Sequence, residues 1–248
     1  MWRNFLKSIV RFLFNLLTRY EVSGIENIPN RGALILAANH MSRLDPPLIF
    51  ILLKREDVTV LVADKYLRYP FIRFLINSVN GIWLHREDAD SRALRVARNH
   101  LQKGGVLGIA PEGTRSQVEA LIPAKTGVAY LADKTKAPVV PVAITGTEKA
   151  IWQLFHLRRP LITVRIGEPF QLRPLDRRDR SSSLQKNTDE IMSRIAAMLP
   201  PRYRGAYAGH PRVQEILAEQ VGAAEMPQPV KLGAPYGPRN RIIDAHIK

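Results

Sequence analysis

The chain lacks cysteine altogether in its 248 residues. This excludes a disulfide framework, a thiol nucleophile and cysteine-ligated zinc or iron–sulfur sites. Long hydrophobic runs are also missing, because the longest stretch without Asp, Glu, Lys or Arg reaches only from Phe74 to His85. A bilayer-spanning helix needs about 20 apolar residues, so no transmembrane helix is expected.

Acidic residues are scarce relative to basic ones. The chain has 22 Asp plus Glu against 37 Lys plus Arg, a net charge of +15. Such an excess favours an anionic partner, whether nucleic acid, an anionic membrane surface, or an acidic substrate or carrier protein. The 46% hydrophobic and 24% charged residues are near globular averages, so one sizeable core is expected.

Residues 1–20 predict an amphipathic helix with one broad apolar face and one polar stripe. This segment holds four cations and no anion, a pattern typical of a helix lying in a membrane interface, where its cations would attract anionic phospholipids. A signal peptide fits less well, because basic residues interrupt the apolar stretch and no small-residue cleavage site follows. The alternative is an ordinary amphipathic helix packed on its own domain.

From residue 33 onward, short aliphatic runs alternate with longer helical stretches, which is typical of an α/β fold. The runs predict strands at 33–38, 58–63, 81–84, 106–110, 139–144 and 161–166, and helices at 46–54, 66–78, 90–102, 125–134 and 182–199. The expected architecture is a mainly parallel central sheet flanked by helices and preceded by the amphipathic helix. We divide the chain into the membrane-interface helix 1–20, an α/β domain 21–205, and a loosely packed or extended tail 206–248, which becomes proline-rich.

A histidine and an aspartate follow the first predicted strand. Ligands of open α/β sheets bind beyond the carboxyl ends of the strands, where His40 and Asp45 are expected. If the turn folds back, Asp45 accepts the Nδ1 proton of His40 and leaves Nε2 as a general base. The alternative is a plain helix N-cap for Asp45 and an incidental surface histidine.

Cations follow three other predicted strands. Arg115 has the fork geometry that suits phosphate or carboxylate, and Glu112 either orients it or fixes the loop by accepting backbone N–H bonds. A nucleotide loop is excluded because Pro111 removes a donor and Glu112 adds an anion; the alternative is an acidic turn with an exposed arginine. With Lys65 and Arg86, this set suggests a phosphate-bearing substrate. No metal ligand spacing is present, so neither metal nor other cofactor is expected.

Taken together, these segments resemble the glycerolipid acyltransferase family, typified by the bacterial 1-acylglycerol-3-phosphate acyltransferases. The first family block, N-H-x-S-x-x-D, is matched by Asn39, His40, Ser42 and Asp45. The other three blocks are matched in order by residues 81–86, 111–116 and 139–144. Residues 125–127 also resemble the lysine and glycine that follow the arginine loop in the family. Ala110 and His85 depart from the family pattern. These two departures affect the acceptor head group and acyl packing rather than the base.

The resemblance implies an acyltransferase that moves a fatty acyl group from an acyl thioester, acyl-CoA or acyl carrier protein, to the free hydroxyl of lysophosphatidic acid, giving phosphatidic acid for phospholipid synthesis. His40 would be the general base and Asp45 its partner. The acceptor-binding residues implied are Arg86, Glu112, Gly113, Thr114 and Arg115, with Lys65 as a helper. The enzyme would be peripheral or monotopic on the cytoplasmic face of the cell membrane.

Other functions stay open. The acceptor is alternatively another lysolipid or glycerol phosphate. From a different class, the chain is a basic module that binds nucleic acid or membrane without catalysis; dispersed cations and the lack of a recognition motif argue against nucleic acid as partner. A third alternative is an inactive membrane-surface scaffold of the same fold, against which the intact His40 and Asp45 argue.

Overall fold

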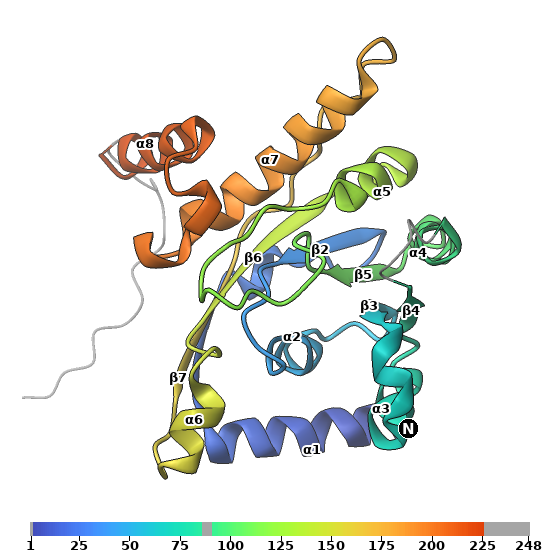
Figure 1. Ribbon diagram of the computed structural model, residues 1–248, viewed down its shortest axis with the longest axis vertical. Helices are drawn as coiled ribbons and strands as arrows, with labels where there is room; N and C mark the ends of the chain where they lie inside the picture. Colours follow the sequence, from blue (N-terminus) through green and yellow to red (C-terminus); the bar gives the residue numbers. More distant parts are fainter. Residues whose placement is uncertain (1, 86–90, 226–248) are drawn as a thin grey trace, which may run out of the picture.

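The computed structural model describes residues 2–85 and 91–225 (Figure 1). The strands are β1 (Arg19–Ser23), β2 (Leu34–Ala38), β3 (Val58–Ala63), β4 (Ile82–Leu84), β5 (Val106–Ile109), β6 (Val139–Thr145) and β7 (Leu161–Ile166). The α-helices are α1 (Trp2–Leu17), α2 (Asp45–Leu52), α3 (Pro70–Ser78), α4 (Ser91–Gln102), α5 (Gly127–Thr135), α6 (Ala150–Phe155), α7 (Arg180–Met198) and α8 (Pro211–Glu225). Arg86 and residues 226–248 lie outside the described residues.

The strands form one sheet in the order β1-β7-β6-β2-β5-β3-β4. All neighbours are parallel except β6 and β7, which are antiparallel. The α/β class with a mainly parallel sheet is therefore confirmed, and all six predicted strands are present. The sequence did not reveal β1, because this edge strand alternates between exposed and half-buried residues and has no apolar run.

Helices cover both faces of the sheet. Ile35 and Ala37 of β2 belong to the core under α4, α5 and α7, whereas Leu34 and Leu36 belong to the core under α1 and α2. Figure 1 shows α1 and α2 on one side of the sheet and α4, α5 and α7 on the other. Because central parallel strands are buried on both faces, they read as continuous aliphatic runs, and this made them easy to predict.

Helix α1 is amphipathic as expected, but its basic stripe faces the protein. Lys7 Nζ donates to the carbonyl oxygens of Leu53 (3.0 Å) and Arg55 (3.1 Å). Arg11 donates to the carbonyl oxygen of Ile51 at 2.6 Å. These acceptors lie at the C-terminal end of α2, where carbonyl groups lack helical partners and the helix dipole favours cations. Burial lowers the pKa of Lys7 below its ordinary value.

The apolar side of α1 is consequently the solvent-facing side. Its exposed large side chains are Trp2, Phe5, Ile9, Phe12, Leu13, Leu16 and Leu17. The expectation that the cations of this helix attract anionic lipid is wrong for Lys7, because this side chain is buried and backbone carbonyl groups hold it. Arg11 is exposed, so for this residue the expectation stays a prediction. No helix in residues 2–85 and 91–225 is long and apolar enough to span a bilayer.

The expected loose tail is wrong for its first part. Short helical turns at Gly205–Tyr207 and helix α8 replace it, and α8 packs on α7 (Figure 1). Tyr207, Val213 and Ile216 are buried. These anchors and the partly buried Leu217 are dispersed along the stretch, so they give no recognisable periodic pattern.

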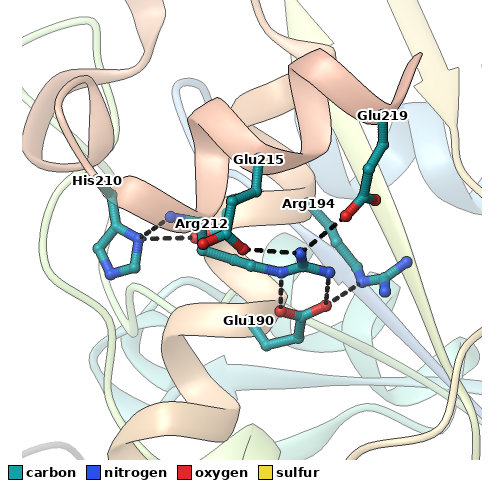
Figure 2. Close-up of polar contacts among 7 residues, drawn as sticks. Glu190, Arg194, His210, Arg212, Glu215 and Glu219 are labelled. Carbon is teal, nitrogen blue, oxygen red and sulfur yellow. Dashed lines mark hydrogen bonds and ion pairs between the residues drawn. The ribbon is translucent and has the colours of Figure 1, made fainter. Parts of the chain in front are cut away.

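An ionic cluster holds α8 to α7 (Figure 2). Arg212 Nε and Arg194 Nε each lie 2.7 Å from a different carboxylate oxygen of Glu190. Burial by itself would raise the pKa of Glu190, but the bonds from Arg212 and Arg194 outweigh it and lower that pKa below its ordinary value. Glu215 and Glu219, both on α8, also accept from Arg212.

Candidate active site

His40 lies just beyond β2, and a buried amide fixes the end of that strand. Asn39 Nδ2 donates to the carbonyl oxygen of Ile144 (2.9 Å), and the Ile144 N–H donates to Asn39 Oδ1 (2.7 Å). This pair of bonds ties the end of β2 to β6. The backbone before His40 is therefore held at the carboxyl ends of the central strands, where the sequence placed the site.

His40 and Asp45 form a close pair. Nδ1 of His40 lies 2.9 Å from Oδ2 of Asp45, and the two side chains are 22% and 4% exposed. The same Oδ2 accepts the backbone N–H groups of Met41 (2.8 Å) and Ser42 (2.7 Å). Asp45 makes no helix cap, because the cap residue of α2 is Leu44 and no side chain caps it. The carboxylate instead closes the turn that carries His40.

Thr147 supplies the remaining bond to the aspartate. Its Oγ1 donates to Oδ1 of Asp45 at 2.6 Å. Since an ionised carboxylate only accepts, the network assigns the His40 proton to Nδ1 and leaves a lone pair on Nε2. Among the described residues, Nε2 has no hydrogen-bond partner. The geometry is that of an oriented general base.

Glu112 is buried behind His40. Its side chain lies in the core at 2% exposure; Oε1 accepts the backbone N–H of His40 (2.9 Å) and Oε2 that of Ile122 (3.1 Å). Burial raises the pKa of Glu112 to about 7, with these two bonds acting in the opposite direction. Of the two alternatives for this residue, the structure shows the one that fixes the loop.

The neighbouring loop residues are more open. Gly113 has φ +70°, a conformation that side chains disfavour, and a Cβ there would lie 3.1 Å from Cδ of Lys125. Thr114 is exposed and Arg115 half-buried. Within the described part of the chain, the Arg115 guanidinium has neither a hydrogen-bond nor an ion-pair partner. A half-buried, unpaired guanidinium at this position is suited to bind an anion.

The remaining predicted cations are less closely placed. Lys65 is exposed after β3, which β5 separates from β2. Its ammonium lies 5.4 Å from the centre of the Tyr66 ring. Arg86 falls outside the described residues. The structure thus brings together His40, Asp45 and the loop of Glu112 to Arg115, whereas Lys65 follows a strand two positions from β2 in the sheet.

Sequence reasoning missed three contributors. The sequence identifies Asn39 only as a member of the first motif. It assigns no role to Lys125, whose aliphatic stem lies against Gly113. Thr147 went unnoticed although it lies two residues after β6, at a strand end where functional residues were sought. Its neighbours Gly146 and Glu148 line a cavity of about 650 Å³, but His40, Asp45 and Arg115 are not among the residues that line this cavity.

A second histidine–aspartate pair follows the carboxyl ends of β3 and β4, toward the β4 edge of the sheet. Nδ1 of His85 is 2.6 Å from Oδ2 of Asp64, but these side chains are 70% and 33% exposed. The distance alone therefore does not distinguish the two pairs. What distinguishes His40 is a buried aspartate fixed by two backbone amides and a threonine.

Comparison with known proteins agrees with this geometry. Residues 19–145 match the family model described as Acyltransferase, and the chain belongs to that family. The match spans the strands and loops that carry His40, Asp45, Glu112 and Arg115.

Individual relatives share a narrower name. The chain is 32% identical over 132 residues to the 1-acyl-sn-glycerol-3-phosphate acyltransferase of Borreliella burgdorferi, covering 51% of each. It is 22% identical over 191 residues to the protein of that name from Bacillus subtilis, covering 77% of this chain and 94% of that one. A coconut relative of the same name is 35% identical over 142 residues, covering 55% of this chain and 46% of the relative. The chain thus spans about half the length of the Borreliella and coconut proteins.

A solved structure resembles this fold. The crystal structure of the 1-acyl-sn-glycerophosphate (LPA) acyltransferase, PlsC, from Thermotoga maritima superposes with a TM-score of 0.61 at 27% identity. The match covers 76% of each chain.

Proposed function

We propose that this protein transfers a fatty acyl group from an acyl thioester to the free hydroxyl of lysophosphatidic acid, giving phosphatidic acid. The observation that carries the proposal is the His40 imidazole, held at Nδ1 by buried Asp45 with Nε2 unpartnered. The names of the relatives agree with this acceptor.

The chemistry needs no covalent enzyme intermediate. Nε2 of His40 takes the proton of the acceptor hydroxyl as its oxygen attacks the thioester carbonyl carbon. The tetrahedral intermediate then collapses, the carbon–sulfur bond breaks, and the departing thiolate takes the proton from the imidazolium. Asp45 stabilises the transient positive charge on the ring. General-base catalysis of this kind contributes roughly 10² to 10⁴ in rate.

We assign the acceptor phosphate to the cations near the loop. Arg115 offers a fork of donors and Lys125 a point charge beside Gly113. Arg86 remains part of this proposal from the sequence resemblance, with Lys65 as a more distant helper. Glu112 serves as a positioning residue, since its carboxylate binds the backbone of His40 and not the open site.

The proposal includes a membrane setting, because lysophosphatidic acid and its product are lipids. The exposed face of α1 carries seven large apolar side chains while its basic stripe is held inside. The surface of a soluble protein rarely carries so many exposed apolar side chains together, and such patches mark interaction sites. We therefore propose peripheral or monotopic attachment through this face, on the cytoplasmic side, where acyl-CoA and acyl carrier protein are available as donors.

Release of free thiol tests the chemistry. Purified protein is given lysophosphatidic acid in mixed micelles with either acyl-CoA or acyl carrier protein thioester, and His40→Ala is compared with His85→Ala. The expected result is thiol release that needs the lysolipid and falls about 10² to 10⁴-fold in His40→Ala. In His85→Ala, next to the proposed acceptor ligand Arg86, thiol release at saturating lysolipid falls far less. Both variants are checked for folding by circular dichroism.

Equal loss in the two variants would contradict the assignment of the base. If neither donor gives activity, the proposal that the protein is this enzyme is contradicted. If only lysolipids other than lysophosphatidic acid are acylated, the proposed acceptor is contradicted.

A further inference from the structure

Helix α6 and the turn that follows it expose large apolar side chains far from α1 in the sequence. Trp152, Phe155 and Leu157 are 57%, 83% and 96% exposed. Trp152 stacks on His156 with ring centroids 4.0 Å apart, so its ring is held in place while facing solvent. Burial in the fold does not account for these three side chains.

Leu157 also has an unfavourable backbone. Its φ is +54°, in the left-handed region. The N–H of Arg158 bonds to Gln153 O (2.9 Å) and that of Leu157 to Leu154 O (3.0 Å), which together form a helix-ending motif that usually has glycine at this position. A leucine here strains the backbone and exposes a hydrocarbon side chain. Such an outlier points to a function at that position.

The turn is joined to the end of α1. Arg159 donates to the carbonyl oxygens of Asn15 (2.6 Å) and Thr18 (2.8 Å), and the Arg19 N–H donates to Pro160 O (2.8 Å). Figure 1 shows α6 beside the C-terminal end of α1, at the same extremity of the molecule. The apolar turn therefore lies next to the C-terminal end of α1.

We propose that α6 and this turn, with Trp152, Phe155 and Leu157, form a second membrane contact that inserts into an anionic bilayer together with α1. The inference rests on the membrane setting proposed above. The exposed cation Arg158 directly follows Leu157 and suits lipid phosphates at the depth where the apolar side chains enter. One helix in an interface can roll about its axis, whereas a second contact beside it fixes the rotation and hence the direction in which His40 faces.

Single cysteines test insertion directly, because the chain has none of its own. Phe12→Cys on α1, Leu157→Cys on the turn and Val96→Cys on α4 are each labelled with a polarity-sensitive fluorophore. Val96 is a matched exposed apolar residue whose helix covers the opposite face of the sheet. Vesicles of phosphatidylcholine with phosphatidylglycerol are then added to the full chain.

The expected result is a blue shift at positions 12 and 157 and none at 96. A shift at 12 alone overturns the second contact and leaves the membrane attachment of α1 standing. No shift at 12 or 157 overturns both. A shift at 96 as large as at 157 also overturns the inference, because the label would then be driving insertion.

Leu157→Gly separates membrane binding from a structural role. Glycine relieves the positive φ, so the melting temperature is expected to stay equal or rise. The affinity for anionic vesicles is expected to fall about tenfold, the loss for one apolar side chain, while Val96→Ala leaves it unchanged. A lower melting temperature with undiminished vesicle binding would instead show that Leu157 serves the fold.

Discussion

Buried charge is satisfied in opposite ways in two regions of this molecule. At the carboxyl ends of the central strands, the carboxylates of Asp45 and Glu112 are held by backbone N–H groups. Along α1, backbone carbonyl groups hold the buried cation of Lys7 and bind the exposed Arg11. The first arrangement leaves His40 partly open to a ligand, and the second turns the apolar face of α1 outward.

This difference determines which kind of partner each region can bind. A pair of buried carboxylates orients one titratable ring, which is useful for chemistry on a small substrate. Cations that bind carbonyl groups along one side of a helix leave a wide apolar strip on the other side, which is useful for contact with lipid. In both regions the polar backbone, rather than another side chain, does most of the compensation for burial.

The largest expected effect is on catalysis at the first region. In Asp45→Asn, the amide oxygen can still accept the N–H groups of Met41 and Ser42, so the turn is kept while the negative charge is lost. We expect kcat to fall about 10² to 10⁴-fold, the range for general-base assistance. Steady-state kinetics measures kcat, and a melting curve shows whether the variant is folded. A folded variant with near-normal kcat would mean that the carboxylate charge is unimportant.

A pH effect on stability tests the burial of Glu112. Because its pKa rises from 4.5 to about 7 on folding, the folded chain binds more protons than the unfolded chain between these values. Its contribution to stability therefore falls as pH rises from 4.5 to 7, by about 3 kcal/mol. Glu112→Gln should remove that fall. Urea unfolding at pH 5 and pH 8 compares the two chains, and identical pH slopes would contradict the raised pKa.

The two faces of α1 should separate stability from membrane binding. Lys7→Ala leaves the carbonyl groups of Leu53 and Arg55 without their donor, so we expect the free energy of unfolding to drop by about 1–3 kcal/mol. Phe12→Ser alters an exposed side chain and should change it by less than about 0.5 kcal/mol, yet weaken vesicle binding. Urea titration and vesicle co-sedimentation measure both. If Phe12→Ser instead lowers the free energy of unfolding and leaves vesicle binding unchanged, the apolar face packs on protein.

The smallest expected effect is at the cluster between α7 and α8, where the charges are only partly buried (Figure 2). In Arg212→Ala, Arg194 still pairs with Glu190 at 2.7 Å. We expect a loss of about 1 kcal/mol in the free energy of unfolding, reduced further by salt. The exposed Arg177→Ala is the matched control and should be neutral. Equal losses of stability in Arg212→Ala and Arg177→Ala would show a general effect of positive charge and no specific role for the ionic cluster.

Much of the site was predictable because its signals are local. His40 and Asp45 are five residues apart, and the third block runs from Pro111 to Ser116. Central strands are continuous aliphatic runs, so their carboxyl ends could be located. Thr147, by contrast, approaches Asp45 from 102 residues away, and no sequence period marks such a contact. The position of α8 was missed because dispersed anchors and an ionic cluster hold it.

By itself, the amino-acid sequence determined the layered α/β fold, the amphipathic character of residues 1–20 and the identity of the histidine–aspartate pair, because these depend on periodicity and short spacings. Only the tertiary structure decided which face of α1 turns outward, since the free C-terminal carbonyl groups of α2 come from another segment of chain. It likewise decided that Glu112 lies behind His40. Both outcomes follow from the need to pair buried charge with backbone groups that folding brings close.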